Sequence, residues 1–144
     1  MSDATVWTHE QFESMSWHDN HVHAMRIVEG KYGAGELQLD IDYIAEWLPG
    51  PNKSCRFRIV PATLRFLEVT NLRASAALGP FSLHAIERRV ESRPRYEAQI
   101  WTLRINWPQG KITFEAMGYE QRTTGPAGIT DSQRLGPDQR PRGA

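Results

Sequence analysis

Apolar and polar residues alternate strictly over several short segments of this chain. Residues 36–43 read Glu-Leu-Gln-Leu-Asp-Ile-Asp-Tyr, with acids on one side and large apolar residues on the other. The same alternation recurs over residues 55–59, 101–107 and 112–116, with no long helical pattern between them. A period of two residues is typical of a strand with one buried face. The pattern therefore predicts an all-β, antiparallel barrel or sandwich of about six to seven strands.

One short helix is predicted near the N-terminus. Thr8 is placed as an N-cap and Gln11 follows three residues later, which is the spacing of a capping box. Trp7 and Phe12 are placed to form a hydrophobic staple across this helix start. These signals predict a helix near residues 9–15.

A strand is predicted over residues 21–29, followed by a glycine-rich turn at residues 30–35. Which face of this strand points inward stays open, because both faces carry apolar residues. Val22, Ala24 and Val28 share one face, and His21, His23, Met25 and Ile27 share the other.

Two strands change phase, which predicts bulges of the kind that a curved or closed sheet needs. The alternation shifts between Phe66 and Leu67 and again near Ala85 and Ile86. The strand before the first shift is expected over residues 55–60, ending at Pro61. Residues 71–80 are expected to form a connection.

The last hairpin is predicted from its apolar residues. If Trp107 faces Ile112, then Ile105 faces Phe114, and all four side chains lie on one side of the sheet. This register requires a four-residue loop at residues 108–111.

The length of 144 residues indicates a single domain. Residues 1–120 are expected to form the β-rich domain. Residues 121–144 are rich in Gly, Pro and Arg and are expected to form an irregular C-terminal extension, with at most one helical turn at residues 129–133.

Composition bears on the kind of partner and on the location of the protein. The chain has 17 basic and 17 acidic residues, so it lacks the net charge that favours nucleic-acid or membrane binding. No apolar run approaches the roughly 20 residues of a membrane-spanning helix, and no leader is recognisable, so a soluble cytoplasmic protein is expected. The single cysteine, Cys55, has the parity of an inward residue and is expected in the core.

Three histidines near the first strand form a candidate metal site. His21 and His23 would project from one strand face about 7 Å apart, close enough to share an ion. His18 and Asp19 lie just before them. No distant third ligand has a recognisable spacing, and the same residues can instead bond the backbone where the strand begins.

The acids of residues 36–46 form a second candidate site. Glu36, Asp40, Asp42 and Glu46 would make a stripe of negative charge that could hold a basic partner. Alternatively, they pair across strands with Arg56, Arg58 or Arg104. No environment that would separate the pKa values of two carboxylates is visible, so glycosidase chemistry is not indicated.

Several motifs together resemble a family of small uncharacterised bacterial proteins. They are Ser16-Trp17-His18-Asp19, Asp40-Ile41-Asp42-Tyr43-Ile44 with Trp47, Pro61-Ala62-Thr63-Leu64, Ile105-Asn106-Trp107-Pro108 and Ile112-Thr113-Phe114-Glu115-Ala116. That resemblance implies a β-rich cytoplasmic domain without a known catalytic role. Trp17, His18 and Asp19 are also distantly similar to the first-strand entry of immunity proteins from bacterial polymorphic toxin systems, which bind and block a toxin.

These observations favour a non-catalytic, immunity-like module that binds another protein and needs no cofactor. The predicted binding residues are Asp40, Asp42, Glu36, Trp17, His18 and Asp19. The alternative is a metal-dependent enzyme that holds a divalent transition metal with His21, His23 and His18. The oligomeric state stays open.

Overall fold

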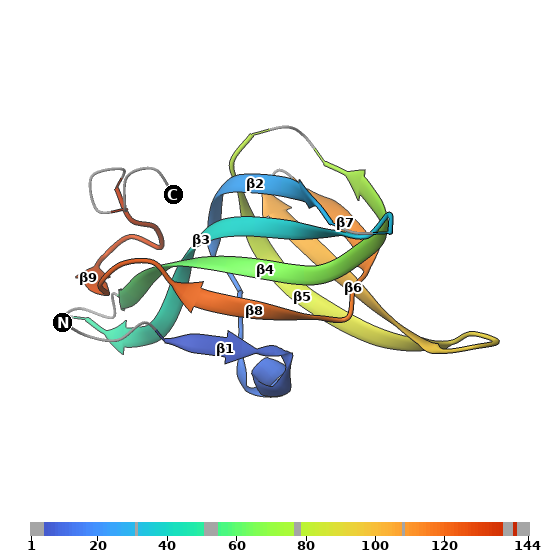
Figure 1. Cartoon of the computed structure of the whole chain (residues 1–144). Helices are drawn as coiled ribbons and strands as arrows, with labels where there is room; N and C mark the ends of the chain where they lie inside the picture. The colour runs from blue at the N-terminus through green and yellow to red at the C-terminus, as the bar shows by residue number, and fades with distance from the viewer. Residues whose placement is uncertain are drawn as a thin grey trace.

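The computed structural model describes residues 5–30, 32–50, 55–76, 79–107, 109–136 and 140. Within these residues lie nine strands and one short 3-10 helix, and every strand pairing is antiparallel (Figure 1). The elements are β1 (Val6–Thr8), η1 (His9–Ser14), β2 (His21–Glu29), β3 (Gly35–Pro49), β4 (Cys55–Ser75), β5 (Phe81–Ser92), β6 (Glu97–Trp107), β7 (Gly110–Glu115), β8 (Gly118–Thr123) and β9 (Gly128–Thr130). The all-β prediction is confirmed.

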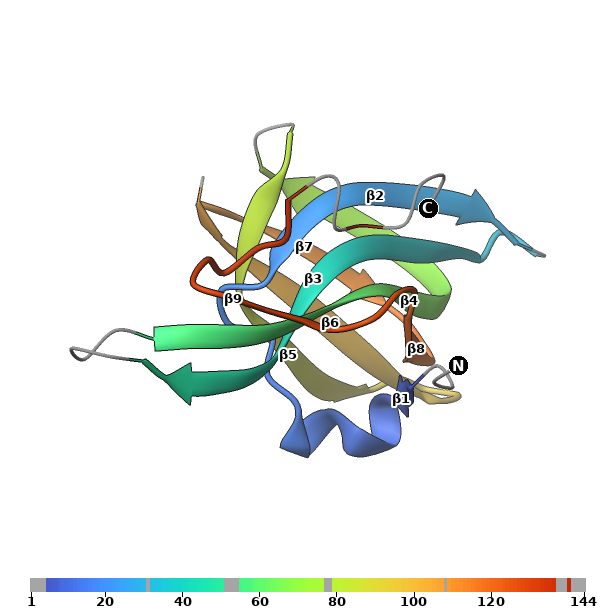
Figure 2. The ribbon, with the colours of Figure 1, turned by 90° about the vertical axis from the view of Figure 1, so that its left-hand side faces the viewer.

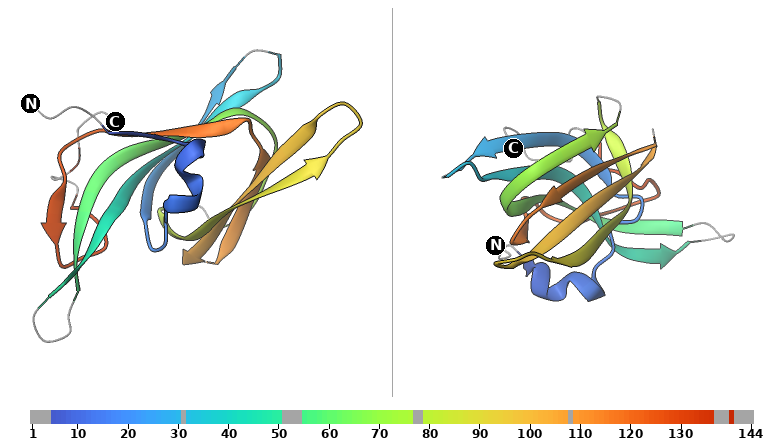
Figure 3. Two further views of the ribbon diagram at one scale, coloured as in Figure 1. Left: turned by 90° about the horizontal axis from the view of Figure 1, so that it is seen from below. Right: turned by 90° about the vertical axis from the view of Figure 1, so that its right-hand side faces the viewer.

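The sheet closes on itself as a barrel because β4 pairs with β3 and also with β7, the last strand of the sheet order. β4 pairs with β3 from Cys55 to Val69 and then with β7 from Thr70 to Ser75. The ring therefore runs β4-β3-β2-β5-β6-β7 and returns to β4 (Figure 3). β8 continues β7 along the same edge of β4, and β1 pairs with the outer edge of β8.

β4 bends sharply where it changes partners. Glu68 and Asn71 both adopt positive φ, at 52° and 53°, and the register with β7 shifts between Thr70 and Arg73. Such a bulge increases local twist and re-aims a strand. The predicted phase change between Phe66 and Leu67 therefore marks the real bend, but residues 71–75 form strand and not a connection.

Pro61 does not end its strand, contrary to the prediction. The Pro61 carbonyl accepts a hydrogen bond from the Thr124 backbone N at 2.8 Å. In an antiparallel strand the nitrogen and the carbonyl of a residue point to the same side. The missing N–H therefore faces the connection between β8 and β9, where no ladder bond is lost.

The barrel interior is filled by large apolar side chains, and the predicted inward residues Leu37, Leu39 and Ile41 are fully buried. Trp101 lies among the aromatic rings at the centre. Phe66 and Trp101 have centroids 5.4 Å apart, and Trp101 and Tyr119 have centroids 5.6 Å apart, both edge to face. Each such pair adds about 0.5–1.5 kcal/mol beyond the area it buries.

The N-terminal helix follows its predicted capping. Thr8 accepts from the Glu10 backbone N, and the capping box with Gln11 is formed. The element is a 3-10 helix, and Phe12 packs edge to face on Trp101 at 5.4 Å. The helix thus covers one end of the barrel (Figure 1).

Two predictions of local packing were wrong. Cys55 is exposed, because it opens β4 where the β3–β4 hairpin extends beyond the barrel (Figure 2). In the last hairpin the closing pair is Ile105 and Gly110, and Leu103 faces Ile112. Four residues lie between the two members of this pair, as predicted. The pair itself lies two residues before the predicted pair, Trp107 and Ile112, on each strand. Because a shift of two residues keeps each side chain on its face, the apolar residues still share one side of the sheet. The predicted loop position Pro108 lies outside the described residues.

Part of the predicted C-terminal extension forms strands. Residues 121–123 belong to β8, and residues 128–130 form β9 on β4. Residues 128–136 and 140, which we call the strap, pass over the outside of β3 and β4 (Figure 2). β9 ends at Thr130, and residues 131–134 are bends without a helical turn, so the helical turn predicted at residues 129–133 is wrong.

β2 contains a bulge at His23 that decides which of its faces is inner. Its register with β3 shifts between Val22 and Ala24. Directly paired residues lie on the same face of a sheet. Met25 pairs with Leu39 and Ile27 with Leu37, so both join Val22 on the inner face. Simple alternation places Val22 on one face and Met25 with Ile27 on the other, whereas the extra residue at His23 brings all three to the same face.

Candidate functional site

The two central carboxylates of the acidic stripe predicted on β3 are not exposed to solvent. Asp40 and Asp42 are 3% and 0% exposed. Asp40 accepts from Arg26 Nη1 at 2.6 Å and Nη2 at 2.9 Å, and from Thr63 Oγ1 at 2.8 Å. Burial acts to raise the pKa of Asp40, but the hydrogen bonds from Arg26 and Thr63 hold it below its usual value.

Asp42 anchors the strap. Its carboxylate accepts from the Leu135 backbone N at 3.1 Å, and from Arg140 Nε at 3.0 Å and Nη2 at 2.5 Å. The Leu135 side chain completes a small apolar cluster with Ile44, Phe57 and Ile59. Apolar and ionic contacts together therefore hold the strap on the outside of the barrel.

The other acids of the stripe form cross-strand pairs, and one of the two, Glu46 with Arg58, is a pair that the alternative interpretation names. Glu36 lies 3.1 Å from Arg65 Nε, and Glu46 lies 3.0 Å from Arg58 Nε. Arg104 pairs with Glu87 and not with the stripe. Exposed pairs of this kind contribute about 0–1 kcal/mol each.

His21 and His23 lie beside the Asp42 carboxylate. Their rings stack with centroids 6.4 Å apart, and His23 Nε2 is 3.9 Å from Asp42 Oδ1. Burial lowers the pKa of both imidazoles below 6.5, and the nearby Arg140 guanidinium lowers both further, against the opposing effect of Asp42. Both rings are therefore neutral at pH 7 and fill space beside the ion pair.

The structure does not gather the predicted metal ligands. His18 lies against other groups: its Nδ1 is 3.2 Å from the His84 carbonyl oxygen, and its ring stacks on Trp47 at 6.5 Å. Across the described part of the chain, no group of three or more His, Cys, Asp or Glu side chains is arranged to hold a metal ion.

Trp17, His18 and Asp19 each contact other elements of the domain. Trp17 is buried and donates from Nε1 to Gln121 Oε1 at 2.8 Å. Asp19 adopts a positive φ of 63°, and its carboxylate accepts from Asn106 Nδ2 at 3.1 Å and Gln133 Nε2 at 3.0 Å. This motif joins the start of β2 to β6 and to the strap.

The barrel wall has an opening that the sequence pattern does not predict. Within the described residues β2 pairs with β5 only at His21 and Val22, so residues 24–29 have no neighbour on that edge. β4 leaves β3 after Val69, so residues 70–76 face the same gap. We call this gap, between residues 24–29 and residues 69–76, the open seam.

Apolar side chains on the inner face of β2 reach solvent at the open seam. Met25 is 43% exposed and Ile27 is 71% exposed, although both face the side on which Leu37 and Leu39 are fully buried. Val28, on the outer face, is partly exposed as well. A closed barrel would cover such residues with the next strand.

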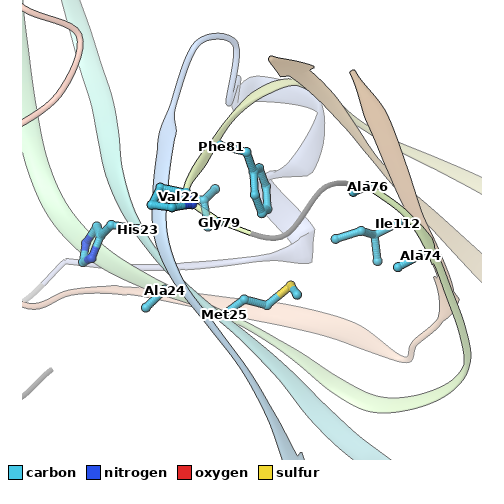
Figure 4. Close-up of a pocket in the computed structure, with 10 residues that line it drawn as sticks. Val22, His23, Ala24, Met25, Ala74, Ala76, Gly79, Phe81 and Ile112 are labelled. Carbon is cyan, nitrogen blue, oxygen red and sulfur yellow. The ribbon is translucent and has the colours of Figure 1, made fainter. Parts of the chain in front are cut away.

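Two hollows lie along the open seam. The first, of about 330 Å³, has the small residues Ala24, Ala74, Ala76 and Gly79 in its wall and the core residues Val22, Phe81 and Ile112 beneath. Met25 points across this hollow, whereas His23 turns away from it (Figure 4). The second, of about 500 Å³, lies between the β2–β3 turn and residues 69–72.

Comparison with protein-family models, with curated proteins and with solved structures finds no significant match. The family resemblances given above therefore stay predictions. In the described part of the chain, no helix is long and apolar enough to cross a membrane.

The open seam could not be found from simple alternation. The feature of β2 that bears on it is the bulge at His23, an extra residue that puts Met25 and Ile27 on the inner face. The burial of Asp42 depends on Leu135 and Arg140, which follow it by 93 and 98 residues.

Replacing Arg140 tests the anchor of the strap. Arg140→Gln should lower the free energy of unfolding by about 3 kcal/mol, because it leaves the fully buried Asp42 carboxylate without its cation. Urea denaturation measures this change. Arg58→Gln, which breaks the exposed pair with Glu46, is the matched control and should change stability by less than about 1 kcal/mol. Equal effects of the two variants would contradict the assignment.

The lowered histidine pKa values predict loss of stability in mild acid. Unfolded imidazoles take up protons near pH 6.5, whereas folded His21 and His23 do so only at lower pH. Their contribution is therefore present above about pH 6.5 and is lost as the pH falls. Urea midpoints at pH 7.5 and 5.5 should differ less for His21→Gln with His23→Gln than for the wild type. An unchanged difference would refute this explanation.

Proposed function

We propose that this domain is a non-catalytic module that binds another protein at the open seam. One observation carries the proposal: Met25 and Ile27 face the inner side of the barrel wall and are nevertheless exposed. Apolar side chains on a free strand edge favour association, and soluble proteins usually cover or charge such edges. A binding partner would supply the cover.

The proposal moves the binding surface away from the residues that the sequence favours. Asp40 and Asp42 are buried and already paired with Arg26 and Arg140, so neither carboxylate is available to a basic partner. Trp17 is buried as well. Of the predicted binding residues, Glu36 alone lines a hollow of the open seam.

A binding role without catalysis fits the chemistry of the polar cluster. The hydrogen bonds that the Asp42 carboxylate accepts come from Leu135 and Arg140 of the strap, inside the domain. The open seam itself has apolar walls, with His23 turned away from its first hollow (Figure 4). Apolar walls favour affinity and supply no proton transfer.

Replacing one side chain of the open seam tests the proposal. Immobilised wild-type protein should retain a partner from cells of the source organism, and Ile27→Lys should weaken that binding at least about tenfold, since it puts a charge where apolar contact is required. Val90→Lys, at a 58% exposed position on β5 far along the barrel wall, is the matched control and should bind like the wild type. Quantitative mass spectrometry of the retained proteins measures the effect.

Two results would contradict the proposal: no protein retained by the wild type, or a partner retained equally by Ile27→Lys. The identity of a retained partner also tests the narrower prediction of an immunity-like role, which requires that partner to be a toxin.

A further inference from the structure

We propose that the open seam takes one extended segment of the partner as an added strand, antiparallel to β2, with a basic residue beside Glu29. This inference rests on the proposed function and specifies how the partner is held. It follows from the backbone edge, the side chains around it and the charges at its two ends.

The free edge of β2 selects an extended backbone. Just before the gap, β5 binds this side of the chain: the Leu83 backbone N donates to the Asn20 carbonyl at 2.9 Å, and Val22 pairs with Phe81. The strand stops there because Pro80 has no N–H and Gly79 adopts a φ of 122°, which turns the chain away. Residues 24–29 are left with backbone groups that an added antiparallel strand can pair.

The side chains leave space for such a strand. Ala74 and Ala76 on the opposite wall are small, and the first hollow reaches down to Ile112. Apolar residues at every second position of an added strand would point to the inner face, beside Met25 and Ile27. The intervening residues would point to solvent, so the segment is expected to alternate.

The charges of the open seam are unequal at its two ends. Glu29 and Glu36 are the only charged side chains among the described residues that line the second hollow. Glu36 is paired with Arg65, whereas Glu29 has no ion pair within the described residues. At the other end, His23 is held neutral by burial and the lining is apolar. A basic residue on the segment therefore belongs at the Glu29 end.

These two ends set the order of residues in the segment. A strand antiparallel to β2 begins beside Glu29 and ends beside Ala24, because Val22 is already paired with Phe81. The expected segment therefore carries its basic residue first and its alternating apolar residues after it. The inference excludes two other occupants of the open seam: a second copy of this chain, and a small apolar molecule in the first hollow.

Selection from a displayed library of random nine-residue peptides tests the inference. Wild-type protein should enrich peptides with a basic residue followed by apolar residues at every second position. Glu29→Lys should change the preferred first residue from basic to acidic, and Ile27→Lys should reduce the binding of enriched peptides at least about tenfold. Val90→Lys is the control for both and should enrich the same peptides as the wild type.

Amide hydrogen exchange supplies the readout of the backbone. A selected peptide should slow exchange of amides within residues 24–29 of β2 by at least about tenfold, because they gain acceptors on the added strand. Amides of β3, which already has neighbours on both sides, should be unaffected.

Several results would overturn the inference: no enrichment, enriched peptides with helical spacing, or peptide binding without added protection in β2. Dimerisation of the wild type that Ile27→Lys abolishes would overturn it in favour of a second copy. If the partner-capture experiment succeeds while these tests fail, the proposed function stands and only the added strand is wrong. Failure of both removes the binding role itself.

Discussion

The bend in β4 is the constraint on which the rest of this structure depends. β4 has 21 residues and pairs with β3, β7, β8 and β9. Positive φ at Glu68 and Asn71 lets its last residues leave β3 and join β7, which closes the barrel. The same turn takes residues 70–76 away from β3 and leaves them facing residues 24–29 of β2. Residues 24–29 have no strand neighbour on that side, because within the described residues β2 pairs with β5 only at His21 and Val22. Closure at one place therefore produces the open seam at another.

The outer face of β3 shows how ionic groups can hold a covering segment. Asp42 is fully buried, and burial of an unpaired carboxylate would destabilise the fold by several kcal/mol. Leu135 and Arg140 supply the bonds that offset this penalty, while Leu135 packs beside Ile44. The strap can occupy its position only with those partners, so the buried charge defines where the C-terminal segment lies. The neutral rings of His21 and His23 complete the cluster.

Much of the fold was predictable because alternation is a local property. Leu37, Leu39 and Ile41 face the core as predicted, and Thr8 with Gln11 begins the helix as predicted. The phase change at Phe66 correctly marked a bend. Local patterns failed where distant residues decide the outcome: Pro61 is tolerated because Thr124 lies beside it, and Cys55 is exposed because its hairpin extends beyond the barrel.

The candidate site was predictable only in part, for the same physical reason. Alternation shows that Asp40 and Asp42 face away from the core, but not that Arg26 and Arg140 bury them there. One inserted residue at His23 moved Met25 and Ile27 to the inner face. The exposure of these two residues depends on where β4 and β5 go, and that depends on the closed sheet as a whole.

Amide hydrogen exchange in the free protein tests this account most directly. β3 has neighbours on both edges, so all its amides from Leu37 to Ile41 should exchange slowly. β2 has a neighbour on one edge only beyond Val22, so every second amide over residues 24–29 should exchange at least about tenfold faster than those of β3. Slow exchange at every amide of residues 24–29 would show that another strand already pairs there, and the open seam would not exist.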